Sequence, residues 1–109
     1  MEHTLSIKNN ALFSKIYKKG NCLVSYALIM YVMPNGLDIN RMGITVSKIV
    51  GKAVNRNRAK RLIRESYRYY EKCTSGYDFV FVARTKTPEV GFFEVKKEMG
   101  KLFGKAKLK

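Results

Sequence analysis

The sequence is poor in acidic residues, and this shortage excludes a class of enzyme. It has 8 Asp and Glu residues against 22 Lys and Arg, and the acids are scattered along the chain. A metal-dependent protein nuclease needs two or more carboxylates that converge on one cation. Glu94 and Glu98 lie one helical turn apart, but lysines stand at pairing distance from both, which indicates a solvated helix face. We therefore predict no catalytic residue and no metal ion bound by the protein alone.

Histidine and cysteine are also scarce. His3 lies at a chain terminus, where a general base is not expected. Cys22 and Cys73 have neither metal-ligand spacing nor a disulfide framework, so we expect two reduced thiols. The segment GKAV at 51–54 lacks the upstream glycine and downstream Ser or Thr of a phosphate-binding loop. No active site made of protein side chains is predicted.

Long hydrophobic runs are missing as well. The longest, residues 22–33, is interrupted by Ser25 and is far shorter than a membrane span. The opening residues MEHT lack the basic and apolar regions of a signal peptide. Binding to a membrane surface through charge alone is disfavoured, because the basic helix described below uses its apolar stripe for packing. We expect a cytoplasmic protein with no membrane partner.

What the sequence does have is positive charge and apolar content. The formal net charge is +14, and hydrophobic residues make up 46% of the 109 residues. Seven Tyr and six Phe predict a folded chain, with one domain at 1–109 and frayed ends at 1–8 and 104–109. So large a charge costs stability through self-repulsion unless a polyanion neutralises it. The expected partner is a nucleic acid or another polyanion.

Hydrophobic periodicity and turn signals predict an α/β (α+β) sandwich, with helices against a small sheet. Asn9 or Asn10 caps the first helix, and Thr87 caps the last, with Pro88 at its first position. Pro34-Asn35-Gly36 predicts a turn between two antiparallel strands, which a bend would divide into three. In order, the predicted elements are a helix at 9–18, strands at 22–33 and 37–46, a helix at 56–72, a strand at 77–84 and a helix from 87.

The stretch from Lys52 to Arg64 contains six basic residues and no acid. On a helix, its apolar side chains cluster on one side and its basic side chains spread over the other. This pattern indicates a packed helix with a positive face. Guanidinium groups bind phosphate through paired donors, and the positive end of the helix dipole adds to the attraction. A solvated basic face is the simpler alternative, and charge alone does not separate RNA from DNA or other polyanions.

Four aromatic residues form a second candidate site. Phe13 and Tyr17 share one face of the first predicted helix, and Tyr26 and Tyr31 lie on the next strand. Core packing is the simpler explanation for aromatic residues at helical spacing. The alternative is a partly open cleft on which unpaired bases stack. The hydroxyl groups of Tyr17 and Tyr31 favour a half-exposed site, because a buried hydroxyl needs a partner.

The segment GKAVNRNRAKRLIRE at 51–65 resembles the signature of the bacterial ribonuclease P protein subunit. FSKIYKKG (13–20), RMGITVSK (41–48) and YDFVFVAR (77–84) resemble the same family in the same order, and the likeness runs from about residue 9 to 103. It implies an α-β sandwich with a small, mostly antiparallel sheet and a left-handed βαβ crossover, opposite to the usual hand. The family signature of Arg-Asn-Arg, one residue, Lys-Arg, two residues and Arg is met by Arg56, Asn57, Arg58, Lys60, Arg61 and Arg64.

The resemblance also implies a function. Such a subunit assists a catalytic RNA that removes the 5′ leader of precursor tRNA; the RNA holds the Mg²⁺ ions and cuts, and no protein partner is required. The implied contacts to the catalytic RNA are Lys52, Arg56, Asn57, Arg58, Lys60, Arg61, Arg64 and Arg68. The implied lining of the leader-binding cleft is Phe13, Tyr17, Tyr31, Thr45, Lys48 and Arg84.

Three positions depart from the family pattern. The family usually has Asn in place of Lys52, often has Lys in place of Ile49, and commonly has Phe in place of Tyr17, which keeps the stacking face. Composition alone fits a non-enzymatic, ribosomal-type RNA-binding protein equally well. A self-sufficient nuclease is a third hypothesis, which the scattered acids oppose. The ribonuclease P subunit is the function that the sequence favours.

Overall fold

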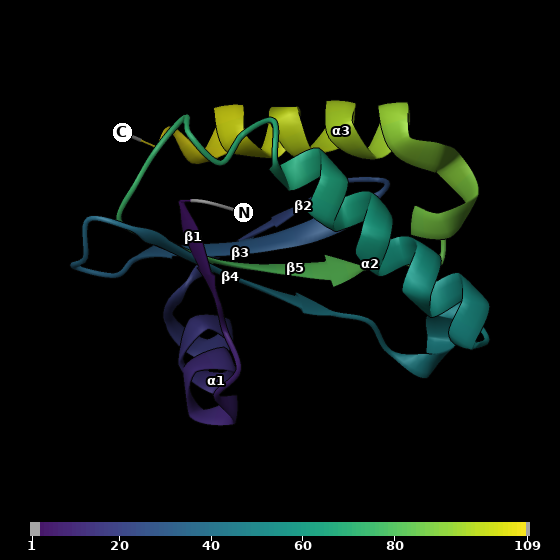
Figure 1. Cartoon of the computed structure of the whole chain (residues 1–109), viewed down its shortest axis with the longest axis horizontal. Helices are drawn as coiled ribbons and strands as arrows, with labels where there is room; N and C mark the ends of the chain where they lie inside the picture. Colours follow the sequence, from purple (N-terminus) through teal and green to yellow (C-terminus); the bar gives the residue numbers. More distant parts are fainter. Residues whose placement is uncertain (1–2, 109) are drawn as a thin grey trace.

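A five-stranded sheet with helices on both faces forms the fold (Figure 1). The computed structural model describes residues 3–108, so the expectations for residues 1, 2 and 109 lie outside the described residues. In chain order the elements are β1 (Thr4–Ser6), α1 (Asn10–Lys19), β2 (Asn21–Val24), β3 (Leu28–Pro34), β4 (Asn40–Thr45), the 3-10 helix η1 (Lys48–Val50), α2 (Ala53–Tyr67), β5 (Tyr77–Ala83) and α3 (Thr87–Ala106). The strand order is β1-β4-β5-β3-β2, with α1 on one face and α2 and α3 on the other. This architecture confirms the predicted α/β sandwich.

The strand pairings correct the hairpin expected at Pro34-Asn35-Gly36. Strands β3 and β4 flank this turn, but β5 lies between them and pairs antiparallel with β3 and parallel with β4. At the edges, β1 pairs parallel with β4, and β2 pairs antiparallel with β3. The sheet is therefore more evenly mixed than the mostly antiparallel sheet that was expected. The turn does reverse the chain, because β3 and β4 run in opposite directions.

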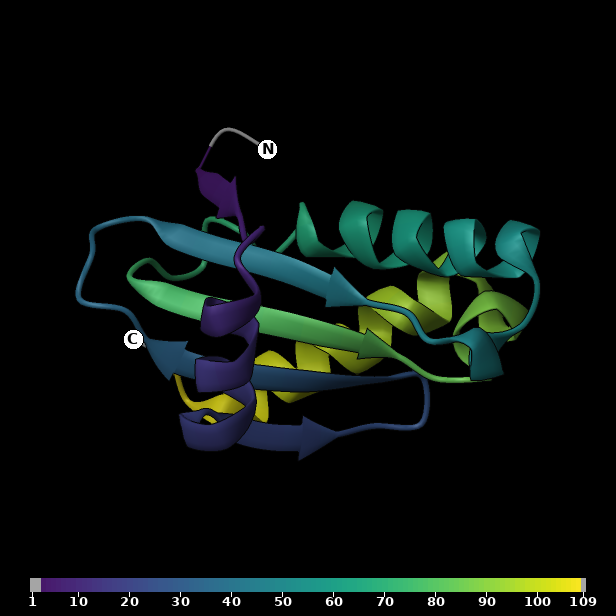
Figure 2. The ribbon, with the colours of Figure 1, turned by 90° about the horizontal axis from the view of Figure 1, so that it is seen from below.

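The segment β4-α2-β5 forms a crossover between neighbouring parallel strands. In Figure 2 both strands point to the right with β4 above β5, α1 lies in front of the sheet, and α2 lies on the far face. A chain that leaves β4, passes behind the sheet and returns in the strand below makes a left-handed connection. The usual hand is right, so this geometry confirms the crossover that the resemblance implied.

The predicted strand at 22–33 is in fact two strands, β2 and β3, joined by a tight turn. The backbone N–H and the hydroxyl of Ser25 both donate to the Leu28 carbonyl, at 2.9 and 3.0 Å. The Leu28 N–H donates back to the Ser25 hydroxyl oxygen at 3.3 Å. Ser25, which interrupts the apolar run, therefore forms the turn of a β2–β3 hairpin. The segment 21–46 contains three strands, β2, β3 and β4, which is the alternative with a bend.

Element boundaries also differ from the predictions. Helix α2 begins at Ala53, before the expected start at 56, and ends at Tyr67, before the expected end at 72. Fraying was expected for residues 1–8 and 104–109, but Thr4–Ser6 pair with β4, and α3 continues to Ala106. Thr4–Ser6 are held by pairing with β4, and Ala106 packs against the larger core, contacts that a sequence pattern does not show.

Thr87 does not cap α3 as predicted. Its buried hydroxyl donates to the Ala27 carbonyl at 2.5 Å and accepts from the Arg84 N–H at 2.8 Å. The helix has no side-chain cap, and Pro88 lies in its first turn, at the second position and not at the first as predicted. The hydroxyl instead ties the start of α3 to the β2–β3 turn and to the end of β5.

The larger core lies between the sheet and the layer formed by α2 and α3. Phe79 and Phe81 of β5 are fully buried there, and both rings pack edge-on against Tyr67 at 5.7 Å. Each such buried side chain contributes about 1.5–3 kcal/mol relative to an exposed one. A smaller core, centred on Ile16 and Val80, lies beneath α1. Helix α1 crosses only part of its face of the sheet (Figure 2), so the two faces are covered unequally.

Tyr67 gives the fold an alkaline limit. Burial raises the pKa of its hydroxyl to about 12, and the hydroxyl shares a hydrogen bond of 2.9 Å with that of Thr4. Because a Tyr in the unfolded chain titrates near pH 10, the contribution of Tyr67 is complete below that pH and falls by roughly 2–3 kcal/mol as the pH approaches 12. Tyr67→Phe is expected to flatten this fall, measured by urea unfolding at about pH 9 and about pH 11.5. Equal slopes in the two proteins would contradict the assignment.

Candidate nucleic-acid interface

An open hollow of about 410 Å³ lies between α1, the end of β4 and α2. Phe13 and Tyr17 form its aromatic wall, with ring centroids 6.4 Å apart. The Tyr17 hydroxyl forms a 2.5 Å hydrogen bond with the Thr45 hydroxyl across the hollow. Lys60 of α2 also lines it. The structure thus brings three predicted cleft residues together with a lysine that was predicted to lie on the RNA-binding helix.

The strand register supplies an apolar floor beside this hollow. Thr45, Val82 and Ile29 lie side by side on β4, β5 and β3, and all three are half-buried. Side chains two residues apart on a strand share a face, so Tyr31 lies on this face too, and its ring meets that of Tyr17 edge-on at 4.9 Å. We call this combination of hollow and floor the aromatic cleft.

Core packing accounts for two of the four aromatic residues, and the other two are exposed, as a stacking cleft requires. Phe13 and Tyr31 are half-buried and pack against the smaller core beneath α1, as core packing would have it. Tyr17 and Tyr26 are exposed, at 36% and 54% of their surface. The exposed Tyr17 ring beside two anchored rings is the arrangement on which an unpaired base stacks.

The Tyr31 hydroxyl keeps its proton in the aromatic cleft. Interaction with the Cys22 side chain, and then burial, raise the pKa of this hydroxyl above its ordinary value. Cys22 stands beside Tyr31 in the β2–β3 pairing. A neutral hydroxyl donates a hydrogen bond and does not repel phosphate, which suits an anionic ligand.

Gly43 makes room for the Phe13 wall. A Cβ at residue 43 would lie 2.5 Å from Phe13 Cζ and 3.3 Å from Ile7 Cβ. Gly43→Ala is therefore expected to displace the ring and to cost about 1–3 kcal/mol of unfolding free energy, measured by urea titration. Adding Phe13→Leu should recover most of that loss, because the smaller side chain frees the space. No recovery would mean that the clash lies elsewhere.

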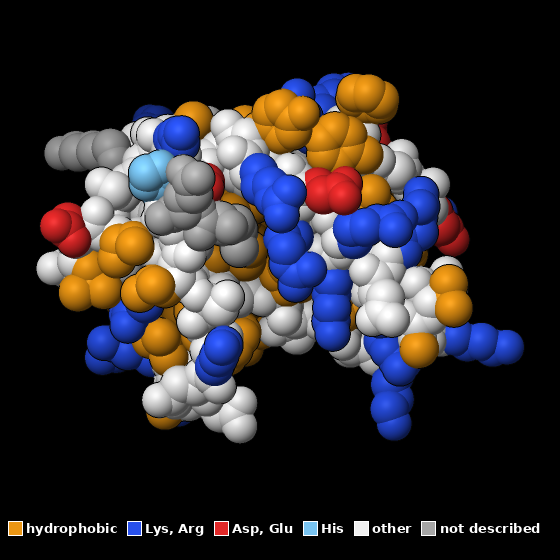
Figure 3. Space-filling model, viewed as in Figure 1, with side chains coloured by type: hydrophobic (Ala, Val, Ile, Leu, Met, Phe, Trp, Pro, Cys, Tyr) orange, Lys and Arg blue, Asp and Glu red, His pale blue; other side chains and the backbone are white. Residues whose placement is uncertain are grey.

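The basic face of α2 points in two directions. Lys60 and Arg64 lie over β1 and β4, where they line a second hollow of about 210 Å³. Arg68 borders a third hollow, on the side of α3. Lys and Arg side chains dominate the surface over α2 in Figure 3. The exposed members of the predicted RNA-binding set are Lys52, Asn57, Arg58, Lys60, Arg61, Arg64 and Arg68.

Two arginines of the signature also make internal contacts. Arg56 is half-buried, and its Nη1 donates to the Gly51 carbonyl at 2.9 Å. The Nε of Arg58 donates to the Pro88 carbonyl at 2.9 Å. A guanidinium has five N–H donors, so both side chains keep donors for phosphate. These two residues fix the start of α2 against η1 and α3.

Lys48 and Arg84 lie apart from the hollow. The Nη1 of Arg84 donates to the Ser25 carbonyl at 2.7 Å, which ties this side chain to the β2–β3 turn. Lys48 begins η1 after β4 and is exposed. Neither residue lines the hollow described above, so their part in leader binding stays a prediction.

Three residues that line the hollow were not predicted from the sequence: Asn10, Ile44 and Val46. Asn10 stands three residues before Phe13 on α1, a spacing that places both on one helix face and could have identified it. Ile44 and Val46 flank Thr45 in the chain, but an alternating strand pattern would direct them to the opposite face. They reach the hollow because β4 ends here.

The acidic residues are arranged as follows. Within residues 3–108, no group of three or more His, Cys, Asp and Glu side chains could hold a metal ion. Glu98 was expected on a solvated face but is nearly buried, and it pairs with Lys101 at 3.2 Å.

Among the helices of the described range, none has the length and apolar character needed to cross a membrane.

Comparison with known proteins covers nearly the whole chain. The sequence model of the Ribonuclease P family matches residues 1–107. The chain is 43% identical over 108 residues to the ribonuclease P protein component of Caldanaerobacter subterraneus subsp. tengcongensis, covering 98% of this chain and 93% of the relative. It is 44% identical over 105 residues to that of Clostridium kluyveri, covering 94% of each chain.

Solved structures give the same result. The fold matches that of the Staphylococcus aureus RNase P protein with a TM-score of 0.85 and 33% identity, over 94% of this chain and 95% of that one. It matches the RNase P protein from Thermotoga maritima with a TM-score of 0.81 and 30% identity, over 92% and 96% of the two chains. The chain therefore belongs to the Ribonuclease P family.

Proposed function

We propose that the chain is the protein subunit of ribonuclease P and acts in tRNA 5′ maturation. The observation that carries this proposal is the position of Lys60, which joins the basic face of α2 to the aromatic hollow. An RNA bound along α2 then lies beside an RNA strand in the hollow. A subunit that holds a catalytic RNA and its substrate together needs two adjoining surfaces of this kind.

In this proposal the two surfaces have separate roles. The basic face of α2 binds the catalytic RNA, because arginine and lysine neutralise phosphates along a backbone. The aromatic cleft takes the single-stranded 5′ leader of precursor tRNA, because rings stack on bases of any sequence. The catalytic RNA holds the Mg²⁺ ions and carries the hydrolysis, and the protein contributes no catalytic residue. The setting of this activity is the cytoplasm.

Reconstitution tests the proposal. Adding the protein to a Clostridium kluyveri ribonuclease P RNA transcript should lower the Mg²⁺ concentration needed for half-maximal cleavage of a precursor tRNA. The physical reason is that the basic face neutralises phosphates that Mg²⁺ would otherwise have to screen. An unchanged Mg²⁺ requirement would overturn the proposal.

Two other outcomes would favour the alternatives. Cleavage that persists after all RNA has been digested from the preparation would make the chain a self-sufficient nuclease. Co-sedimentation with ribosomal subunits, without any effect on precursor cleavage, would make it a structural ribosomal-type protein. Reconstitution with the transcript, cleavage after RNA digestion and co-sedimentation with ribosomal subunits therefore separate the three functions.

A further inference from the structure

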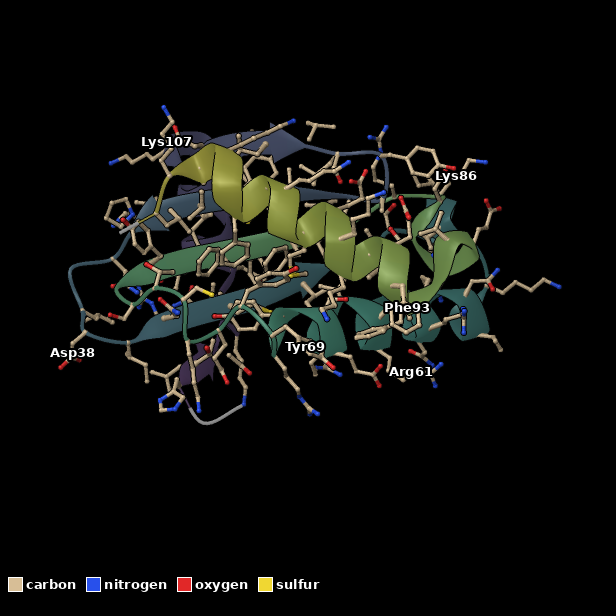
Figure 4. The ribbon with its side chains drawn as sticks, turned by 90° about the horizontal axis from the view of Figure 1, so that it is seen from above. Asp38, Arg61, Tyr69, Lys86, Phe93 and Lys107 are labelled. Atoms are coloured by element: carbon tan, nitrogen blue, oxygen red, sulfur yellow. The ribbon has the colours of Figure 1, made fainter. Side chains whose placement is uncertain are left out.

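Three aromatic side chains gather where α2 and α3 run past each other. Tyr69, just after α2, lies 5.9 Å from the Phe92 ring, and Phe92 lies 5.5 Å from Phe93. Tyr69 is 59% exposed and Phe93 is 82% exposed. Hydrophobic side chains gather over this seam in Figure 3, and Figure 4 shows Tyr69 and Phe93 along the line where the two helices meet. We call Tyr69, Phe92 and Phe93 the seam cluster.

The backbone at Gly91 places the seam cluster at the surface. Gly91 has φ 81° and ψ 177°, a conformation that is essentially restricted to glycine. It separates the first turn of α3 from the remainder, so the helix resumes at Phe92. The two phenylalanines therefore stand at the start of a regular helix, held by a specific backbone feature.

Charged groups surround the rings. The Lys96 Nζ lies 3.8 Å from the Tyr69 ring centroid. Arg61 precedes Glu65 by one turn of α2, so the two side chains share one face of the helix. A hollow of about 350 Å³ opens here, within the size range of small-ligand sites. Its lining residues are Glu65, Arg68, Tyr69 and Phe92.

We propose that the seam cluster is a second RNA-binding site, which holds one unpaired nucleotide of the RNA partner. The base stacks on Tyr69 and Phe93. Arg61 and Arg68 meet its phosphates, and the Glu65 carboxylate accepts a hydrogen bond from an N–H group on the edge of the base. This inference rests on the proposed RNA-binding function. It adds a base-stacking contact beside Arg61 and Arg68 of the predicted RNA-binding set, and neither the basic face nor the aromatic cleft provides that stacking contact.

The chemistry of the hollow selects a nucleotide over other occupants. Exposed rings with cations beside them are the arrangement that binds unpaired bases. Glu65 is an acceptor that repels phosphate but pairs with base N–H donors. A second copy of this chain is disfavoured, because it would bring one molecule of charge +14 against another.

Titration of the protein with the ribonuclease P RNA transcript tests the site. Phe93→Ala is expected to weaken binding about 5- to 150-fold, the equivalent of losing one stacked base. Phe93→Trp keeps an aromatic ring at this position and should bind the transcript with wild-type affinity. Since Phe93 is 82% exposed, its removal leaves the core intact, and circular dichroism checks the fold. Leu37→Ala is the matched control, because it removes another exposed apolar side chain, in the loop between β3 and β4. This variant should bind the transcript as the wild type does.

The outcomes separate this inference from the proposed function. If the wild-type chain does not bind the transcript, both fail. If the wild type binds and Phe93→Ala binds equally well, the seam cluster is not an RNA site, although the proposed function stands. Loss of self-association in Phe93→Ala, measured by analytical ultracentrifugation without a change in RNA affinity, would reassign the surface to a second copy of the chain.

Glu65→Ala tests the contact to the base. The loss of an acceptor from the base edge should weaken binding about 2- to 10-fold. If Glu65 only repels phosphate, the same variant should bind more tightly, and the base contact would be wrong. Chemical probing of the transcript should show one unpaired nucleotide that the wild-type protein protects and Phe93→Ala leaves reactive. Protection that is the same with both proteins would overturn the site.

Discussion

Replacing Arg61 and Arg64 together by alanine is expected to weaken binding of the ribonuclease P RNA about 25- to 60-fold at about 0.1 M salt. Both side chains are exposed on the basic face of α2, and neither is needed for the core. Each phosphate contact contributes about 0.7–0.9 to the slope of log affinity against log salt, because it releases a condensed counterion. Losing two contacts should therefore flatten the slope by roughly 1.4–1.8. Filter binding across a salt series measures both quantities.

The control must remove the same charge from another place. Lys18→Ala with Lys19→Ala takes two positive charges from the exposed end of α1 and lowers the net charge equally. If affinity depends on net charge alone, the two double variants should weaken binding by the same factor. An unchanged salt slope in the α2 variant would place Arg61 and Arg64 on a solvated face that binds nothing.

The parts of the fold that the sequence predicted are those governed by local signals. Asn9 caps α1, and its side-chain oxygen accepts from the Ala11 N–H at 2.7 Å. Gly20 follows that helix as expected. The run at 77–84 is the central strand β5, buried on both faces, which is why it lacks alternation. Each of these features depends on residues close together in the chain.

Most of the parts that the sequence did not predict depend on distant partners. The turn at 34–36 reverses the chain, but no local signal shows that β5 inserts between the strands on either side of it. The hairpin at Ser25 lacks Gly, Pro, Asn and Asp, and its only turn-forming residue is Ser25, whose hydroxyl is a weaker turn signal. Strand β1 was missed because Thr4–Ser6 is too short to show a period, and its order comes from pairing with β4. For β1 and for the insertion of β5 the missing information is tertiary, whereas for the Ser25 hairpin it is a weak local signal.

The candidate site was predicted as two separate lists of residues, and the structure joins them at one position. A helical wheel gives the direction of Lys60 on α2 but not its neighbours. The left-handed crossover brings this part of α2 beside the end of β4, where Lys60 meets the hollow lined by Tyr17 and Thr45. A right-handed crossover between the same two strands would place α2 on the opposite face of the sheet, which α1 covers in part. The basic face of α2 and the aromatic cleft therefore adjoin because of the β4-α2-β5 crossover.

Tyr17→Ala is expected to weaken binding of the 5′ leader about 5- to 150-fold, or roughly 1–3 kcal/mol, and to leave the binding of a leaderless tRNA unchanged. The ring of Tyr17 is 36% exposed and stands edge-on to Tyr31 at 4.9 Å. It therefore offers a stacking surface that the two half-buried rings beside it hold in place. Binding of precursor tRNA and of mature tRNA to the reconstituted ribonucleoprotein, compared side by side, measures the effect.

Tyr17→Phe separates stacking from hydrogen bonding. This variant keeps the ring but loses the 2.5 Å hydrogen bond with the Thr45 hydroxyl. If the base stacks on the ring, the phenylalanine variant should bind the leader nearly as the wild type does, while the alanine variant should not. Equal weakening for both tRNA substrates, or a loss of folding stability in Tyr17→Ala, would make Tyr17 a packing residue. In that case the leader would have to bind along the half-buried floor of β3, β4 and β5 without help from α1.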